Sequence, residues 1–222
     1  MKKKILISIV IGILVVVILG IIIKYFVKSD TNIPFQISKI TVVSGVDGED
    51  KGKSEEKWNL NIMQNNDIHI DIANINDNEI IDRIIIDNFE ITKVPTKGNI
   101  HIYKPSNRNS TFKNSEEYKV ENEVIFTENE TLNQISLRFA NEYLVNYQSN
   151  DDSIVYDGSL LEKVGITQEE IEFKILFDVS IELKSGKRFK TTIMLEMPNG
   201  DIVQEQISTY EINSNEIVFK EY

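Results

Sequence analysis

Hydrophobic and polar residues alternate with a period of two along most of the chain from Phe35 onward, which is the pattern of half-buried β-strands. The alternation is cleanest over Glu172–Met197, where the odd-numbered positions 173–183 and 189–197, on either side of the turn at Ser185-Gly186, are apolar residues and one threonine. Gly45–Lys57, rich in Gly, Asp, Glu and Lys, is predicted to be a loop. Further strands are predicted at Phe35–Val42 with an irregularity near Lys39, Trp58–Ile62, Ile68–Ile72, Ile80–Ile91, Asn99–Tyr103, Glu123–Thr127 and Gln134–Tyr147.

The same alternation fixes the register of the last predicted hairpin. Directly opposed residues of an antiparallel pair lie on one face of the sheet, so the numbers of paired positions must have an even sum if the apolar faces are to match. A three-residue loop over Lys184–Gly186 meets this condition, with Gly186 in the left-handed conformation of a bulged turn. It predicts the pairs Ile181–Phe189, Phe177–Ile193 and Ile175–Leu195.

Gln64-Asn65-Asn66 has the composition of a turn and lies between two alternating segments. The parity rule predicts a second hairpin here, with Asn66 as the left-handed residue. The expected pairs are Ile62–Ile68, Leu60–Ile70 and Trp58–Ile72, which would place His69 opposite Asn61.

Helical signals occur only in a short stretch between strands. Ser159 is placed to cap a helix over Leu160–Val164, and Gly165 is placed to end it. Thr167 and Glu170 have the spacing of a capping box around a single turn.

About ten short strands with one short helix predict an all-β protein, an antiparallel β-sandwich, over residues 35–222. A domain of this length buries enough surface to need no disulfides. Two smaller sandwiches divided near residues 123–133 are the alternative. The sequence shows no internal repeat and no βαβ spacing.

One segment near the N-terminus is apolar all round instead of alternating. In the run Ile5–Ile23 only Ser8 is polar, and at about 1.5 Å per residue this run spans roughly 28 Å, close to the hydrocarbon core of a bilayer. Tyr25 and Phe26 follow, at the level where aromatic rings favour the membrane interface. The run is longer than the apolar region of a signal peptide and has no small-x-small cleavage site, so we predict an uncleaved transmembrane helix over residues 5–27 that contacts membrane lipid.

Lysines flank this helix unevenly in a way that predicts its orientation. Three lysines and the α-amine precede the apolar run and two lysines follow it, and the more positive side stays in the cytoplasm. The sequence therefore predicts a single-pass protein of the cell membrane with a cytoplasmic tail over residues 1–4. A tether over residues 28–34 and an outer, extracytoplasmic domain over residues 35–222 complete this organisation.

Charge and composition narrow the range of partners. The formal net charge of the chain is −11, and its first 28 residues contain five lysines and no acid, so the rest carries a net charge of −16. No nucleic-acid partner is expected, because an acidic domain cannot neutralise phosphates. The absence of cysteine excludes disulfides, thiolate metal sites and a thiol nucleophile.

The only row of possible metal ligands is Asp67, His69 and Asp71, which share one face of a predicted strand. Three residues in a row on one strand do not converge as a metal site requires, so these are weak candidates and no metal site is predicted. His101 has no ligand at helical spacing, and the stretches beginning at Asp47 and Asn74 fail the calcium-loop pattern.

Catalytic motifs are absent from the sequence. It contains no Gly-x-Ser-x-Gly elbow, no phosphate-binding glycine loop and no His-Glu-x-x-His pair. We therefore expect no enzyme, no catalytic residues and no cofactor. A glycan hydrolase with two carboxylates across a cleft is the enzymatic alternative.

Several segments carry a family resemblance. They are Asn32–Lys39 (NIPFQISK), Ile86–Thr92 (IDNFEIT), Lys97–Asn107 (KGNIHIYKPSN) and Leu183–Lys187 (LKSGK). With the apolar run before them, they resemble uncharacterised single-pass membrane proteins of clostridial-type, low-GC Gram-positive bacteria. The resemblance implies a cell-membrane location and an outer β-rich domain, and it implies no activity.

These observations predict a membrane-anchored extracytoplasmic interaction or structural module that binds another envelope or membrane protein. Strong acidity favours a basic partner. Tyrosines at strand ends and in loops are the candidate contacts, namely Tyr118, Tyr143, Tyr147 and Tyr156, whereas Trp58 is expected in the core. A ligand- or metal-sensing outer domain that works with a partner membrane protein is the alternative function.

Overall fold

The computed structural model of the chain describes residues 33–51, 58–76, 78–106, 111–127, 132–205, 207–212 and 217–222. Residues 34–222 form one compact unit. Within the described residues, no helix has the length and apolar character needed to cross a membrane. The predicted span over residues 5–27 lies outside them and stays a prediction.

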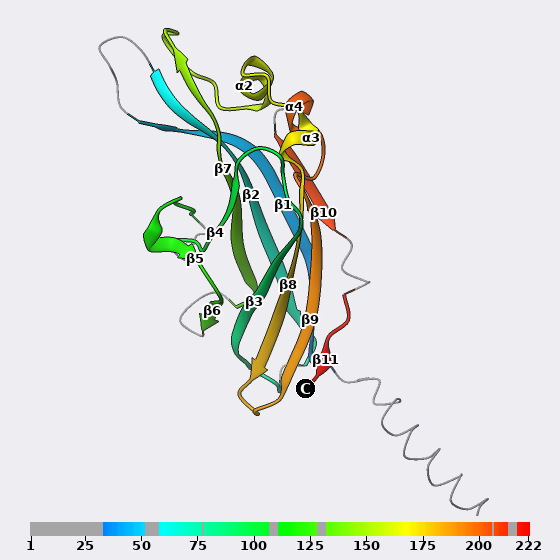
Figure 1. Cartoon of the computed structure of the whole chain (residues 1–222). Coiled ribbons are helices and arrows are strands. Elements are labelled where there is room, and N and C mark those ends of the chain that lie inside the picture. The colour runs from blue at the N-terminus through cyan, green and yellow to red at the C-terminus, as the bar shows by residue number, and fades with distance from the viewer. Residues whose placement is uncertain are drawn as a thin grey trace, which may run out of the picture. The chain divides into compact units, whose positions relative to one another are not determined.

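The described residues form two antiparallel sheets, as an all-β sandwich requires (Figure 1). The first sheet has six strands, in the order β10 (Ser208–Ile212), β1 (Phe35–Asp50), β2 (Trp58–Asn74), β7 (Gln134–Ser149), β4 (Asn99–Tyr103) and β5 (Lys119–Val120). The second has five, in the order β11 (Lys220–Glu221), β9 (Arg188–Met197), β8 (Phe173–Leu183), β3 (Ile81–Lys93) and β6 (Val124–Thr127). The chain crosses between the sheets after β6, because β6 and β7 belong to different sheets.

Aromatic side chains join the two sheets in a first core. Phe139 of β7 packs against Phe177 of β8 with ring centroids 5.9 Å apart, and Phe35 of β1 packs edge-on against Phe189 of β9 at 5.3 Å. All four rings are buried, and paired aromatics of this geometry add to the stability gained by burial.

The β8–β9 hairpin has the predicted register. Ile181 pairs with Phe189, Phe177 with Ile193 and Ile175 with Leu195. Gly186 has a φ of +86°, the left-handed conformation expected of the loop. The even-sum rule was enough to predict this register, because both strands alternate without interruption.

The second predicted hairpin is wrong. Gln64, Asn65 and Asn66 lie in the middle of the single strand β2, which pairs with β1 on one side and with β7 on the other. All three are buried. The amides of Asn65 and Asn66 bond to groups of other strands and loops, and the Gln64 amide nitrogen donates to Asn66 Oδ1. A polar triplet therefore continues a strand where partners from elsewhere in the chain supply its hydrogen bonds.

β1 is longer than predicted. The irregularity expected near Lys39 is confirmed by a shift of register between Ile37 and Lys39. Beyond it, Gly45 to Asp50 continue the strand and pair with β2, so the prediction of a loop from Gly45 was wrong over this part. Residues 52–57 of that predicted loop lie outside the described residues.

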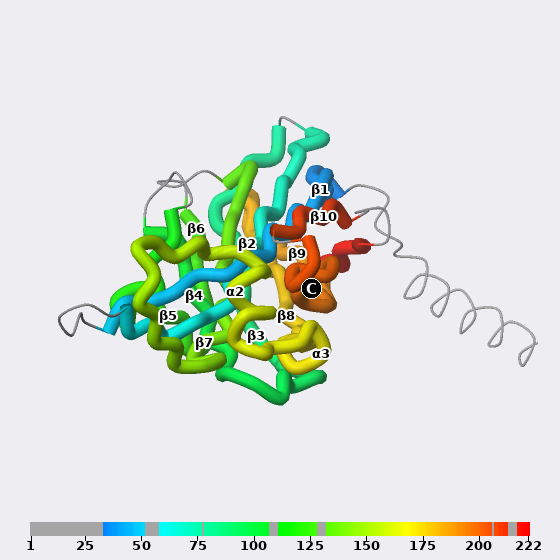
Figure 2. The backbone as a smooth tube through the Cα atoms, turned by 90° about the horizontal axis from the view of Figure 1, so that it is seen from above, coloured from blue at the N-terminus to red at the C-terminus, as the bar shows by residue number. Residues whose placement is uncertain are grey.

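Short helices cover the part of one face of the six-stranded sheet that the five-stranded sheet leaves uncovered. They are α2 (Gly158–Lys163), α3 (Gln168–Ile171) and α4 (Ile202–Glu205), and β4 and β5 are linked through a 3₁₀ turn, η1 (Glu116–Tyr118). Together with β1, β2 and β7, the helices bury a second core of Val46, Leu60, Ile62, Leu144, Leu160, Leu161, Ile166, Ile171 and Ile202. Figure 2 looks down on α2 and α3, with the long strands passing beneath them.

The helix boundaries follow local capping. The cap of α2 is Asp157, whose carboxylate accepts a hydrogen bond from Ser159 N at 2.9 Å, so the prediction of Ser159 as the cap was wrong by two residues. Gly165 has a φ of +70° just after this helix, as expected of its terminating residue. The capping box of Thr167 and Glu170 is confirmed. The helix α4 was not predicted, although Asp201 caps it by accepting hydrogen bonds from Val203 N and Gln204 N at 3.1 and 3.2 Å.

A polar seam separates the two cores on the inner face of the six-stranded sheet. Asn66 accepts hydrogen bonds from Ser44 Oγ at 2.7 Å and from Gln64 Nε2 at 3.1 Å, and its own amide donates to Phe139 O at 3.1 Å. Asn141 pairs with Gln64 across β2 and β7. Ser44, Gln64, Asn66 and Asn141 are fully buried, so apolar residues lie on both sides of the seam along each of these strands.

Candidate functional site

The row Asp67, His69 and Asp71 lies on the outer face of β2, and each member has a different partner on β7. Asp67 accepts two hydrogen bonds from Arg138, at 2.6 and 2.8 Å. His69 Nδ1 lies 2.8 Å from Ser136 Oγ, and Asp71 accepts from Gln134 Nε2 at 2.6 Å. His69 is opposite Thr41 and Ser136, and the prediction that it faces Asn61 was wrong.

These contacts are cross-strand pairs, in which each side chain of β2 binds the residue directly opposite. No group of three or more histidine, aspartate and glutamate side chains able to hold a metal ion occurs in the part of the chain that the structure describes. The row is therefore arranged as a set of separate pairs along the strand.

A second polar group on the same outer face centres on Glu142, which is 7% exposed. Tyr103 Oη donates to Glu142 Oε1 at 2.8 Å, and His101 Nδ1 lies 3.2 Å from Glu142 Oε2. Burial raises the pKa of the Tyr103 hydroxyl, and the hydrogen bond to the Glu142 carboxylate adds to that increase. The carboxylate fixes the orientation of both rings, as a buried charge must have partners.

The segment between β4 and η1 packs over this outer face. Asn114 donates to Asn65 Oδ1 at 3.1 Å and accepts from Arg138 Nη1 at 3.2 Å. The Phe112 ring lies 4.9 Å from the Arg138 guanidinium. These contacts hold the middle of the outer face against a chain segment of the protein itself.

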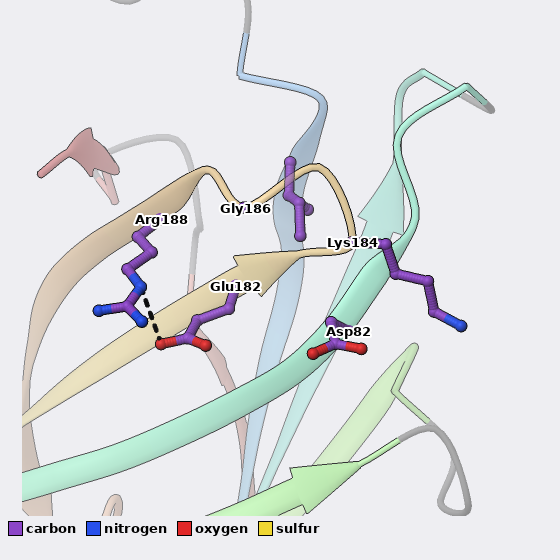
Figure 3. Close-up of a pocket in the computed structure, with 6 residues that line it drawn as sticks. Asp82, Glu182, Lys184, Gly186 and Arg188 are labelled. Carbon is purple, nitrogen blue, oxygen red and sulfur yellow. Dashed lines mark ion pairs between the residues drawn. The ribbon is translucent and has the colours of Figure 1, made fainter.

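A charged pocket of about 430 Å³ lies at the β8–β9 turn (Figure 3). Its residues include Asp82, Lys184 and Gly186, and Glu182 at its wall forms ion pairs with Arg83 at 2.5 Å and with Arg188 at 3.2 Å. Both signs of charge are present and the pairs neutralise one another, so the pocket provides no single strong field for a charged substrate.

The opposite end of the long strands carries carboxylates and exposed aromatic rings. We define the tip as Asp47, Glu49 and Asp50 of β1, Tyr143 of β7, and Tyr156 in the β7–α2 connection. The three carboxylates are at exposed positions, and the two tyrosines are 55% and 37% exposed. At about 3.3 Å per residue, Asp50 lies roughly 50 Å along β1 from Phe35.

Glycine and the neighbouring acids position the ring of Tyr156. A Cβ on Gly48 would lie 2.5 Å from this ring, so the absence of a side chain allows the tyrosine to lie against β1. The pKa of Tyr156 is raised by burial and further by the negative charges of Asp47 and Asp50. The phenol is therefore an uncharged hydrogen-bonding group beside two carboxylates.

Twice at this end of the molecule, a lysine of the chain lies over a tyrosine ring and pairs with a carboxylate. Lys51 Nζ is 5.9 Å from the centre of the Tyr143 ring and forms an ion pair with Glu49.

Lys163 Nζ is 5.5 Å from the centre of the Tyr147 ring and 2.6 Å from Asp151 Oδ2. Both contacts combine a cation–π interaction with an ion pair. The arrangement shows which chemistry this surface accommodates, namely the ammonium or guanidinium group of a basic side chain.

Sequence reasoning identified Tyr143, Tyr147 and Tyr156 as candidate contacts, and the structure places them at or beside the tip, whereas Tyr118 lies in η1. Trp58 is half-buried against the second core and donates its indole N–H to Asp151 O at 2.9 Å. The Glu142 group was missed, because its members come from two strands whose pairing no local pattern reveals.

Comparison with protein-family models, with curated proteins and with solved structures gives no match for this chain. The resemblance to clostridial-type single-pass membrane proteins therefore stays a prediction.

Proposed function

We propose that residues 35–222 form an extracytoplasmic interaction module, held at the outer surface of the cell membrane by the helix over residues 5–27. The tip binds a basic segment of another envelope or membrane protein. The observation that carries this proposal is the repeated lysine–tyrosine–carboxylate contact, made by Lys51 with Tyr143 and Glu49 and by Lys163 with Tyr147 and Asp151.

Two further features support the tip as the binding surface. It lies at the end of the long strands opposite Pro34, where the chain leads into the predicted tether, so it would face away from the membrane. Its carboxylates are exposed and belong to a domain with a net charge of −15 over residues 35–222, which would steer a basic partner towards it. Exposed tyrosine rings are frequent anchors in protein interfaces.

Site-specific photo-cross-linking in intact cells tests this proposal. A photoreactive phenylalanine analogue replaces Tyr143 at the tip of the full-length protein, or replaces Tyr210 on β10, which has a similar exposure of 49% against 55%. We expect one dominant protein adduct from position 143 and none from position 210. The same adduct from both positions, or none from either, would contradict the proposal.

A charge variant separates specific binding from chance proximity. Asp47→Asn, Glu49→Gln and Asp50→Asn together keep the shape of the tip and remove three negative charges. We expect the adduct at position 143 to fall at least tenfold in this variant and to weaken as the ionic strength rises. If the yield of the adduct changes neither in the charge variant nor with ionic strength, charge does not select the partner.

A further inference from the structure

Four segments that are far apart in the sequence are hydrogen-bonded together at the end of the sandwich where the chain enters β1. Ile75 N donates to Pro34 O at 2.6 Å, which ties the β2–β3 turn to the start of the domain. Lys184 N donates to Ile80 O at 2.9 Å, and Tyr222 N donates to Arg188 O at 3.1 Å. We call this end, with Pro34, Ile75, Asn76, residues 78–80, residues 184–188 and Tyr222, the base.

Large apolar side chains are exposed at the base. Ile75, Ile80 and Tyr222 are 61%, 55% and 62% exposed. An isolated exposed isoleucine needs no explanation. Here, however, the two isoleucines occupy one turn, at the same end of the sandwich as Tyr222, where the chain leaves for its predicted membrane span.

The described residues at and beside the base are close to neutral, so an anionic membrane would repel this end less than it repels the domain as a whole. Among them are five cations, Arg83, Lys184, Lys187, Arg188 and Lys220, and four carboxylates, Glu79, Asp82, Glu182 and Glu221. Glu79 pairs with Lys187 at 2.5 Å and Glu182 pairs with two guanidinium groups, so these acids and cations neutralise one another. In contrast, the whole of residues 29–222 carries a net charge of −16.

Chain length keeps the base near the bilayer. The tether over residues 28–34 has seven residues, so even when fully extended it spans at most about 25 Å. Pro34 must therefore lie within that distance of the end of the predicted helix. The interfacial layer outside the hydrocarbon core is itself roughly 5–8 Å thick, which brings the base within reach of lipid headgroups.

We infer that the base is a membrane-contact surface whose partner is the headgroup layer of an anionic phospholipid bilayer. Ile75 and Ile80 enter the interfacial region, Tyr222 lies at headgroup level, and the Lys184 ammonium group approaches lipid phosphates. This inference rests on the proposed membrane anchor. It adds that the base of the domain contacts the membrane. The tip then lies away from the membrane, at a distance set by the length of β1.

The absence of cysteine makes a direct test possible, because one introduced cysteine is a unique labelling site. Full-length protein is reconstituted into nanodiscs of phosphatidylcholine and phosphatidylglycerol, with a spin label at Ile75→Cys or Ile80→Cys. Val155→Cys, 65% exposed beside the tip, and Met194→Cys, 60% exposed on β9, are the matched controls. Accessibility to oxygen, which concentrates in lipid, is compared with accessibility to a water-soluble nickel complex.

We expect the labels at positions 75 and 80 to be at least threefold more accessible to oxygen relative to nickel than the labels at 155 and 194. Replacing phosphatidylglycerol by phosphatidylcholine is expected to reduce this difference. Labels at 75 and 80 that behave like the controls in protein bound to nanodiscs would overturn the membrane-contact surface and leave the anchor intact. Protein that fails to enter the nanodiscs would overturn the anchor and this inference with it.

Discussion

Replacing Asn66 by alanine removes the centre of the polar seam. Asn66 is fully buried, accepts hydrogen bonds from Ser44 and Gln64, and donates to Phe139 O. The variant leaves two buried side-chain groups, Ser44 Oγ and Gln64 Nε2, without the acceptor they use, and each such group costs about 1–3 kcal/mol. We therefore expect Asn66→Ala to lower the free energy of unfolding by about 3–5 kcal/mol, a large loss for a single substitution.

The partner variant tests the mechanism of this loss. Ser44→Ala in the Asn66→Ala background removes one of the stranded groups, so the double variant is expected to regain about 1 kcal/mol relative to the sum of the single effects. Asn146→Ala, at an exposed position of β7, is the control, with an expected change within about 0.5 kcal/mol.

Urea unfolding of residues 29–222 measures these changes, with the fluorescence of Trp58, the single tryptophan of the chain, and far-ultraviolet circular dichroism as two probes. Trp58 reports the second core, whereas circular dichroism reports both sheets. Coincident transitions are expected, because β1, β2 and β7 run through both cores. A loss below about 1 kcal/mol for Asn66→Ala would refute the assignment of Asn66 as the centre of the seam.

Three other measurements probe the capping box and two glycine positions. The pKa of Glu170 is lowered by the hydrogen bond from the Thr167 backbone N–H, aided by the Thr167 hydroxyl. Its contribution to stability is therefore present above the ordinary pKa of about 4.3 and is lost as the pH falls through its lower folded value. The urea midpoint should fall more steeply between about pH 5 and pH 3 in the wild type than in Glu170→Gln, and equal slopes would contradict this. A Cβ on Gly158 would overlap the carbonyl oxygen of Ile202, so Gly158→Ala should cost about 1–3 kcal/mol in the same unfolding assay, and an unchanged midpoint would be the contrary result. Gly186→Ala forces alanine into a φ of +86° and should cost about 1 kcal/mol, with the asparagine variant less affected.

The sequence predicted the fold where the alternation was uninterrupted and the partner strands were adjacent in the chain. Both conditions hold for β8 and β9, and their register followed from parity alone. They fail at Gln64–Asn66, where three amides have the composition of a turn but lie inside β2. The groups that satisfy these amides include Ser44 and Asn114, which are distant in sequence, and no local pattern reports them.

Local sequence patterns were equally unable to predict the tip as a binding surface. Tyr143 and Tyr156 were candidates because they were expected in loops or at strand ends, whereas Tyr143 lies within β7. Their relation to Asp47 and Asp50 depends on the extension of β1 beyond Gly45, in a stretch whose composition is that of a loop. Only the pairing of β1 with β2 over its whole length brings the acids and the rings to the same end of the sandwich.

The length of β1 has a mechanical consequence. A pull between the tether and a partner held at the tip enters the sandwich at Phe35 and runs along the axis of this strand. Backbone hydrogen bonds of an antiparallel pair lie across the strand axis, so such a load shears the ladders to β2 and β10 together and does not peel them open one bond at a time. If residues 5–27 anchor the chain and a partner binds the tip, as proposed, the domain would carry tension as a shear load along β1.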